Sequence, residues 1–485
     1  MLGDEGVMPL VQELTQNTSL TSLSLRLNQL GVSTAAALAQ ALTVNTSLTD
    51  LNMSFNRIGS EGGASIAQAL TQNSSLTSLD LTLNSLGAEG GASIAQALTV
   101  NTGLTMLSLV LNRLGASGAV ALAQALTQNS SLTHLCVGQN GFGDSAAVTA
   151  ALVQMLTQNS SLIYLGWSSN ELGDQGVAVL APALAQNSSL VSLYLGGNQL
   201  GAAGASSLAQ ALTQNTSLIN LHLDNNPLGE NGGAALAQAL TVNSILANLN
   251  LARNQLGAAG ANSLALALTQ NASLVSLGLE GNQIGANGAA ALAGALRQNS
   301  SLTNLDLSFN EITTNSSVAL TLALIQNLGL NILDLSRNQL DVNSAAALEH
   351  ALEFNSSLTS MDLRYNYLGA ESTNYLESIK LFLERNRHNA VSRRLSFEAL
   401  FARHFARQVF ESYSPENKNA VYYQIGKHSG QSNELQFGET NIFTVDWSIF
   451  LRSVADAGLD LKKGVELFLE DEGLGRHYAY HVTLV

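Results

Sequence analysis

Residues 20–47 read LTSLSLRLNQLGVSTAAALAQALTVNTS, and this stretch decides the fold because close copies of it fill most of the chain. Its clearest marker is an asparagine that returns every 28 residues, apart from one 30-residue step. The series is Asn28, Asn56, Asn84, Asn112, Asn140, Asn170, Asn198, Asn226, Asn254, Asn282, Asn310, Asn338 and Asn366. The pattern predicts 13 consecutive copies of one structural unit, preceded by a half-copy that begins at Leu2.

The first half of each unit predicts a short strand. In the first unit, Leu23 and Leu25 alternate with small or polar residues, a period of two that sends the leucines to one face. Asn28 follows where the chain must turn away from the strand, and its amide can satisfy backbone groups that strand pairing no longer reaches. We therefore expect an asparagine ladder along the molecule.

The second half of each unit predicts a helix. In the second unit, Ile66, Ala69 and Leu70 stand at i, i+3 and i+4, which is the spacing of one buried helical stripe. The helix should end at the sequence Gln-Asn-Ser-Ser of residues 72–75, with the asparagine in the left-handed conformation of a helix C-cap. The same residues form an N-glycosylation sequon. We favour the capping role because the element recurs wherever a helix must end.

A single unit cannot fold alone. About six buried aliphatic side chains at roughly 2 kcal/mol each do not offset the ordering of 28 residues at about 1–2 kcal/mol apiece. Stacked units share a continuous apolar core. We therefore expect an α/β solenoid with a parallel sheet on its concave side and helices on its convex side.

The frame Leu-x-x-Leu-x-Leu-x-x-Asn-x-Leu-Gly followed by a helix resembles the ribonuclease-inhibitor-like class of leucine-rich repeats, from residue 2 to about residue 375. The resemblance implies a horseshoe that recognises a protein partner on its concave face. The class includes sensor ends of innate immune receptors, Ran GTPase activators and effectors secreted by intracellular bacteria. The motif specifies the fold closely and leaves the partner open.

The repeat period stops at Tyr375, which predicts a repeat domain over residues 1–375 and a second unit over 376–485. Of the 25 aromatic residues, 15 lie in the second part, so its composition differs sharply. Ile379 and Leu383 should close the open end of the solenoid. The remainder predicts a small, mainly helical or α+β module of unknown function.

Two features of this second part have alternative interpretations. Six arginines form a basic cluster that would contact acidic lipid or, as we favour, the acidic flank of the solenoid. They are Arg385, Arg387, Arg393, Arg394, Arg403 and Arg407. The ending Thr483, Leu484, Val485 fits the carboxylate pattern that PDZ domains capture by strand addition.

The charge distribution restricts the class of partner. Residues 1–375 contain 7 arginines, no lysine and 21 acidic residues. An acidic solenoid would repel nucleic acid phosphates, and it suits a protein partner with a basic or neutral surface. No apolar run of 18 residues suggests a transmembrane segment.

Other sequence features bear on the compartment. Cys136 is the only cysteine, so no intramolecular disulfide can form and a reducing cytoplasm is expected. Because Met1 falls inside a repeat, no Sec signal peptide is expected. Near-identical repeats, the lysine-free array and the single cysteine also suit an effector that acts in a host cytosol.

Candidate partner-binding residues stand where the concave pattern changes. Most concave positions are Ser, Asn, Asp or Gly, but Met106, His134 and Tyr164 share a column on three consecutive strands. Tyr194 and His222 are neighbours in the next column. Aromatic anchors on a polar face are typical of a protein-binding hot spot. Drift in a duplicated array is the alternative interpretation.

Trp167 stands at a leucine position of the core in the same region, so we expect it to be buried. The carboxylates Asp224, Asp306, Asp334 and Asp362 are candidate contacts for a basic patch on the partner. The last three form one column, where aspartate is common in the family's Leu-Asp-Leu strands, so a structural role is the alternative. A metal ion fits poorly because its ligands would stand in a row.

No nucleophile–base pair, phosphate-binding loop or metal-ligand cluster stands out, so the sequence predicts no catalytic residue, cofactor or metal. The leading interpretation is a non-enzymatic protein-binding scaffold. One alternative is a GTPase activator of the Ran-activator type, although no long acidic tail follows the repeats. The other is an enzymatic module in residues 376–485 that the repeats target to its substrate.

Overall fold

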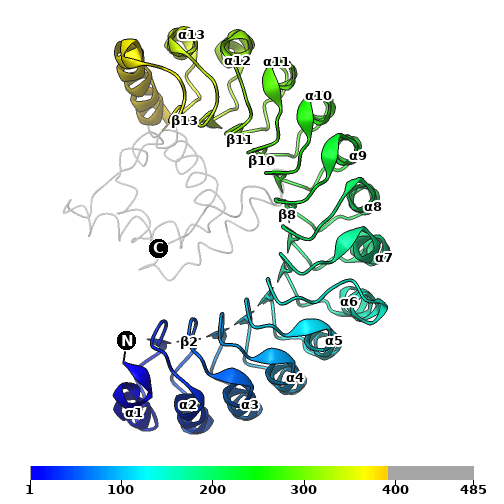
Figure 1. The fold of residues 1–485 in the computed structure, drawn as a ribbon, viewed down its shortest axis with the longest axis vertical. Coiled ribbons are helices and arrows are strands. Elements are labelled where there is room, and N and C mark those ends of the chain that lie inside the picture. Colours follow the sequence, from blue (N-terminus) through cyan, green and yellow to red (C-terminus); the bar gives the residue numbers. More distant parts are fainter. Residues whose placement is uncertain (1, 391–485) are drawn as a thin grey trace, which may run out of the picture. The chain divides into compact units, whose positions relative to one another are not determined.

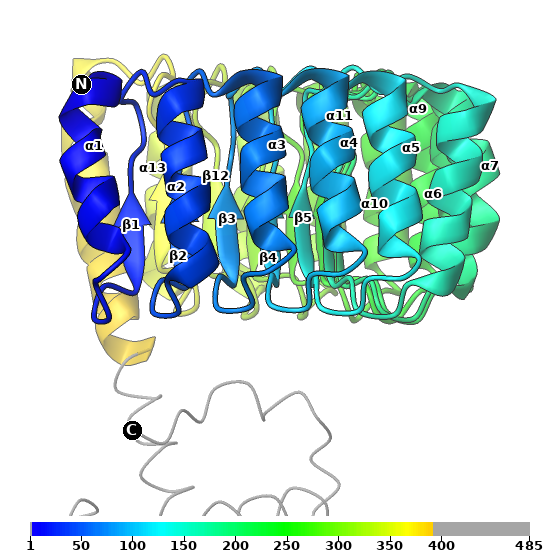
Figure 2. The same cartoon turned by 90° about the horizontal axis from the view of Figure 1, so that it is seen from below.

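The computed structural model describes residues 2–390, which form a curved solenoid of alternating strands and helices (Figure 1). A parallel sheet of 13 strands, paired in sequence order from β1 to β13, lines the inner side of the curve. The helices stand side by side along the outer side (Figure 2). This arrangement confirms the predicted α/β solenoid with a concave parallel sheet and convex helices.

The strands and helices are short and nearly uniform. The strands are β1 (Ser22–Ser24), β2 (Asp50–Asn52), β3 (Ser78–Asp80), β4 (Met106–Ser108), β5 (His134–Cys136), β6 (Tyr164–Gly166), β7 (Ser192–Tyr194), β8 (Asn220–His222), β9 (Asn248–Asn250), β10 (Ser276–Gly278), β11 (Asn304–Asp306), β12 (Ile332–Asp334) and β13 (Ser360–Asp362). The helices are α1 (Gly3–Leu14), α2 (Val32–Val44), α3 (Gly59–Leu70), α4 (Gly87–Leu98), α5 (Gly115–Leu126), α6 (Ala146–Gln158), α7 (Gly173–Gln186), α8 (Ala202–Leu212), α9 (Gly229–Leu240), α10 (Gly257–Leu268), α11 (Gly285–Leu296), α12 (Thr314–Gln326) and α13 (Val342–Phe354). A 3-10 helix, η1 (Ala370–Ser372), and a helix over residues 373–390 follow β13.

The core is continuous from repeat to repeat. Each strand pairs with the same positions of the next repeat, as Leu23 pairs with Leu51 and Leu51 with Leu79. These leucines are buried together with the inward residues of the helices, such as Ile66 and Leu70. Because every repeat covers the apolar face of its neighbour, stability depends on the stack rather than on single units.

The predicted asparagine ladder runs beside this core. In a typical step, the Asn84 side chain donates to the carbonyls of Met53 and Leu81, at 2.9 and 3.0 Å. The Asn112 carbonyl oxygen Oδ1 accepts from the backbone N–H groups of Asn84 and Leu86, at 2.9 and 3.3 Å. Each amide therefore joins two repeats where strand pairing ends.

A second asparagine ladder runs along the ends of the helices, and here the predicted left-handed cap is wrong. Asn45, at the end of α2, has extended backbone with φ −76° and ψ 123°. Asn73 donates through Nδ2 to the Leu42 carbonyl at 2.8 Å, and its Oδ1 accepts from Leu76 N at 2.8 Å. The side-chain amide itself satisfies a terminal carbonyl of the preceding helix, so no left-handed turn is needed.

The position of this ladder also shows whether the predicted glycosylation sequons are accessible in the folded chain. Asn73 is 6% exposed, and the Nδ2 atom that a glycan would modify is engaged in hydrogen bonds. The asparagine of the recurring Gln-Asn-Ser-Ser element therefore links neighbouring repeats by hydrogen bonds.

The C-terminal end of the solenoid is closed by the helix over residues 373–390. Ile379 and Leu383 are buried in the common core, as predicted. Asn386 takes the next place in the second ladder and donates to the Asn355 and Leu358 carbonyls, at 3.0 and 2.9 Å. The compact unit that contains the repeats reaches Asn386.

Arg385, a member of the predicted basic cluster, has a structural partner. Its guanidinium donates to the carbonyls of Leu352 and Asn355, both at 2.8 Å, at the end of α13. A cation is favourable at a helix C-terminus. Most of the predicted module 376–485 lies outside the described residues, and so do Arg393, Arg394, Arg403, Arg407 and the PDZ-like ending.

Candidate functional site

The strand register brings the predicted aromatic residues together in the middle of the concave sheet. Met106 pairs with His134, and His134 pairs with Tyr164, across β4, β5 and β6. Tyr194 pairs with His222 across β7 and β8. Met106 is 46% exposed, and the other four side chains are partly exposed.

Four of these side chains stack into one continuous row, which we call the aromatic ladder. The ring centroids are 5.7 Å apart for His134 and Tyr164, and 4.8 Å apart for Tyr164 and Tyr194. Tyr194 and His222 are stacked at 4.0 Å with an interplanar angle of 11°. The ladder therefore crosses from one column to the next, a connection that the sequence pattern did not predict.

Gly166 lies next to the point where the ladder crosses between columns. It stands between Cys136 and Tyr194 in their shared column. A Cβ at Gly166 would lie 3.4 Å from Cε1 of Tyr164, a close van der Waals contact, so a larger side chain here would meet that ring. The sequence analysis did not single out this glycine. The signal that could have found it is the lack of a side chain at residue 166, between Tyr164 on the same strand and Tyr194 on the next strand.

The surroundings of two ladder residues, Tyr164 and His222, favour their neutral forms. Burial raises the pKa of the Tyr164 hydroxyl, and the neighbouring Cys136 and Tyr194 act in the same direction. Burial lowers the pKa of His222, and Asp224 opposes this shift. Burial also raises the pKa of the Cys136 thiol, which argues against a nucleophilic thiolate. The arrangement therefore suits contact with another surface better than acid–base chemistry.

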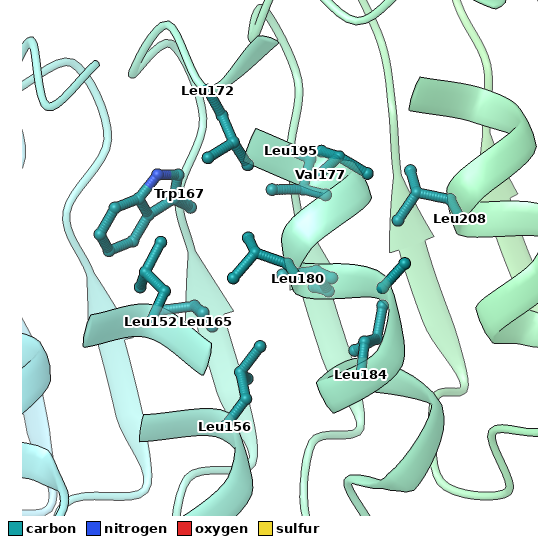
Figure 3. A pocket seen from close by; sticks show the side chains of 12 residues that line it. Leu152, Leu156, Leu165, Trp167, Leu172, Val177, Leu180, Leu184, Leu195 and Leu208 are labelled. Carbon is teal, nitrogen blue, oxygen red and sulfur yellow. The ribbon is translucent and has the colours of Figure 1, made fainter. Parts of the chain in front are cut away.

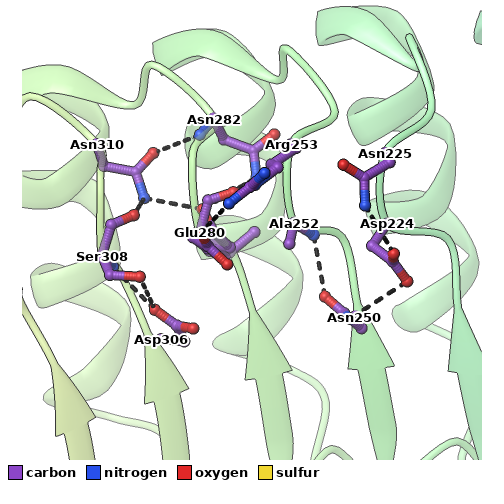
Figure 4. A network of polar contacts seen from close by, with 11 residues as sticks. Asp224, Asn225, Asn250, Ala252, Arg253, Glu280, Asn282, Asp306, Ser308 and Asn310 are labelled. Atoms are coloured by element: carbon purple, nitrogen blue, oxygen red, sulfur yellow. Dashed lines mark hydrogen bonds and ion pairs between the residues drawn. The ribbon is translucent and has the colours of Figure 1, made fainter. Parts of the chain in front are cut away.

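The predicted carboxylates differ from one another in their partners. Asp224 accepts from the side-chain amides of Asn225 and Asn250, at 2.9 and 3.4 Å (Figure 4). In the same region, Glu280 forms an ion pair with Arg253 at 2.8 Å.

Asp306, Asp334 and Asp362 stand in one column, as the sequence predicts. Each accepts from the backbone N–H two residues later, at 2.8 to 2.9 Å. Asn52 makes the same bond in the second repeat. Asp362 also binds the Arg364 guanidinium, and this bond lowers the pKa of Asp362. Each carboxylate of the column therefore binds the backbone just beyond the end of its strand.

Replacing Asp306 with asparagine is expected to leave the protein as stable at pH 7, or more stable by up to about 1 kcal/mol. Burial raises the pKa of Asp306, and Asp334 and Glu280 raise it further. A raised folded-state pKa means that stability is lost as pH rises through that pKa. Asparagine keeps the acceptor for Ser308 without the charge. Urea unfolding of both proteins at pH 7 and pH 4 should show the difference shrinking at pH 4.

The matched control for this prediction is Asp362→Asn, which should behave in the opposite way. Its carboxylate has a lowered pKa, so its contribution is present at pH 7 and lost as pH falls through that pKa. Asp362→Asn should therefore be less stable than the parent at pH 7, with the gap closing at lower pH. A clear loss of stability at pH 7 in Asp306→Asn would contradict the assignment.

Neither a metal cluster nor a spanning helix accompanies these residues in the described part of the chain. Within residues 2–390, no group of three or more His, Cys, Asp or Glu side chains is placed to hold a metal ion. No helix in this range is long and apolar enough to cross a bilayer.

Beneath the ladder, the core contains two aromatic residues. Trp167 is 3% exposed, which confirms its predicted place in the core, and its ring lies 4.6 Å from that of Phe142. An apolar cavity of about 30 Å³ lies beside Trp167, between β6 and α7 (Figure 3). The indole Nε1 is buried without a hydrogen-bond partner. Packing is therefore less regular here than in the leucine-only repeats, next to the 30-residue step.

Comparisons with known proteins agree with this architecture. A family model described as Leucine Rich repeat matches residues 16–39, 44–67, 72–95, 100–123, 186–209, 270–293 and 298–320. Together with the 13-stranded parallel sheet, these matches identify the fold as a leucine-rich repeat solenoid. No curated protein matches its sequence.

Two solved structures with low sequence identity are among the matches. A structure of actin-binding site 2 of leiomodin-1 is 19% identical, with a TM-score of 0.25, over 35% of this chain and 80% of that chain. A crystal structure of a TLR13–ssRNA13 complex is 20% identical, with a TM-score of 0.44, over 77% of this chain. The match spans about half of that receptor chain, 53%.

Proposed function

We propose that this chain is a protein-binding scaffold that holds its partner on the concave sheet through the aromatic ladder. The observation that carries the proposal is the row of four contacting rings, His134, Tyr164, Tyr194 and His222, on a mostly polar face. The rings order one another before a partner arrives, so binding costs little further side-chain entropy. Rigid aromatic anchors of this kind contribute most of the energy of many interfaces.

The partner that suits this surface has a basic or neutral face. Asp224 lies beside His222 at the end of the ladder, and further carboxylates follow at Asp306 and Asp334. The proposed compartment is a reducing cytosol because Cys136 is the only cysteine. This would be the cytosol of a host cell if the chain is a secreted effector.

The test is replacement of Tyr164, Tyr194 and His222 with alanine in the full chain. The amount of the specific partner captured from cell lysate, quantified by mass spectrometry, should fall by about tenfold or more, because hot-spot residues are removed. Circular dichroism should remain unchanged, since these side chains are partly exposed.

The matched control replaces Ser78, Ser276 and Asn304, which occupy concave strand positions outside the ladder, with alanine. This variant should capture the partner within about twofold of the parent, because residues around a hot spot are energetically near neutral. Equal capture by the ladder variant and the parent, with both folded, would rule out the ladder as the binding site.

A further inference from the structure

Four large apolar residues form a row at the N-terminal end of the sheet. Leu27, Phe55, Leu83 and Leu111 each stand one position before a ladder asparagine, and we call them the N-terminal stripe. They continue the strand ladder, because the N–H groups of Leu27, Phe55 and Leu83 donate to the next repeat at 3.1, 2.8 and 2.9 Å. Leu27 is 54% exposed and Leu83 is 38% exposed.

The backbone conformation of the stripe makes these residue types unexpected. Leu27, Phe55, Leu83 and Leu111 have φ values of 59°, 58°, 52° and 59°. This left-handed region is costly for a residue with a large side chain, whereas glycine and asparagine adopt it more readily. Later repeats vary at this position, which is Gln139, Ser169, Gly197, Asn225, Arg253, Gly281, Phe309, Arg337 and Tyr365. Burial in the core does not explain Leu27 and Leu83, and backbone preference explains none of the four apolar side chains.

Three arginines accompany the stripe. Arg26, Arg57 and Arg113 lie on the same turns and are exposed, and the Arg26 guanidinium lies 4.4 Å from the centre of the Phe55 ring. Residues 26–29, 54–57, 82–85 and 110–113 contain no acidic residue, which gives this surface three positive charges. None of the three arginines belongs to an ion pair identified within residues 2–390.

This charge contrasts with that of the rest of the repeat region. Residues 1–375 have 7 basic and 21 acidic residues, a net charge of 7 − 21 = −14. The nearest carboxylates along the chain are Asp50, five residues before Phe55, and Asp80, three residues before Leu83, whose Oδ1 accepts from the Thr82 N–H at 2.9 Å. Glu61 and Glu89 follow in the first turns of α3 and α4. The stripe is therefore an apolar surface with three arginines on an acidic solenoid, and Asp80 is the carboxylate nearest to it in the chain.

We propose that the N-terminal stripe binds an acidic amphipathic helix of a partner protein. Neighbouring strands lie about 4.8 Å apart, and one helical turn rises about 5.4 Å. Apolar side chains one turn apart on such a helix would face successive residues of the stripe. In an extended segment, residues on the same face recur every 6.6 Å or so, a spacing that does not match the distance between neighbouring strands. Carboxylates beside the apolar face would meet Arg26, Arg57 and Arg113.

The experiment selects a displayed library of 16-residue helical peptides against the full chain at low salt. The expected result is enrichment of peptides with an apolar stripe flanked by Asp and Glu. A variant with Leu27→Asn, Leu83→Asn and Leu111→Asn should bind the enriched peptides at least about tenfold more weakly. Its melting temperature should be unchanged or higher, because asparagine relieves the left-handed strain.

Two further variants separate the possible explanations. Arg57→Gln with Arg113→Gln should weaken binding and reduce its dependence on salt. Replacement of the aromatic ladder by alanine should leave peptide binding intact, so this inference stands or falls separately from the proposed function. Enrichment of basic peptides or of none, equal binding by the asparagine variant, or a lower melting temperature of that variant would each overturn the proposal.

Discussion

Replacing Asn282 with alanine is expected to lower the free energy of unfolding of the repeat region by about 3–5 kcal/mol. The side chain is fully buried. Its Nδ2 donates to the carbonyls of Leu251 and Leu279, at 2.8 and 3.0 Å. Its Oδ1 accepts from the N–H groups of Asn254 and Leu256, at 2.9 and 3.3 Å. Alanine would leave the Leu251 carbonyl and the N–H groups of Asn254 and Leu256 unpaired, at roughly 1–3 kcal/mol each before relaxation, whereas the Leu279 carbonyl keeps its bond from Asn310 Nδ2 at 2.8 Å.

Urea unfolding followed by circular dichroism measures this loss, and Asn366→Ala is the matched control. Asn366 ends the same ladder but is only partly buried, so water can replace its hydrogen bonds. We expect its replacement to cost less than half as much. A break at Asn282 also uncouples repeats on both sides, because each repeat is stable only through its neighbours. A loss below about 1 kcal/mol for Asn282→Ala would show that the ladder contributes little.

Replacing Trp167 with alanine is the second large effect, with an expected loss of about 3–5 kcal/mol. The indole is buried against Phe142 and borders a cavity that already measures about 30 Å³. Alanine would enlarge this cavity, and the surrounding leucines of β6, β7 and α7 can close it only in part. Thermal and urea unfolding of the parent and the variant measure the loss.

Trp167→Leu separates the effect of volume from that of residue type. Leucine stands at the equivalent position in later repeats, as Leu195 and Leu223. It would also remove the buried Nε1, which has no hydrogen-bond partner. We expect a loss smaller by about 2 kcal/mol than that of the alanine variant. Equal losses for the two variants would mean that the indole makes a specific contact that leucine cannot replace.

The fold of this protein could be predicted because the repeat makes position in sequence equivalent to position in space. Residues 28 apart are neighbours on adjacent strands, as the pairing of Ser22 with Asp50 shows. The columns of Met106, His134 and Tyr164, and of Asp306, Asp334 and Asp362, followed from counting alone. A one-dimensional stack has few alternative arrangements, so periodicity was sufficient.

Side-chain geometry could not be predicted in the same way. The helix-end asparagines were expected to turn left-handed, yet Asn73 uses its amide to reach the preceding repeat. Tyr164 and Tyr194 belong to different columns, so their ring contact depends on side-chain conformations on two strands and not on the repeat period. Counting acidic residues also did not show that Asp362 is bound by Arg364.

The sequence by itself determined the solenoid, its 13 strands, its two faces and the residues that line each column. The period carries this information because every repeat meets a copy of itself. The tertiary structure decided which side chains touch: the row of stacked rings, the internal partners of the carboxylates, and the exposure of Leu27 and Leu83. These contacts depend on side-chain rotamers and on the residues of adjacent strands. The residue types at these positions differ between repeats, so the repeat period does not predict the contacts.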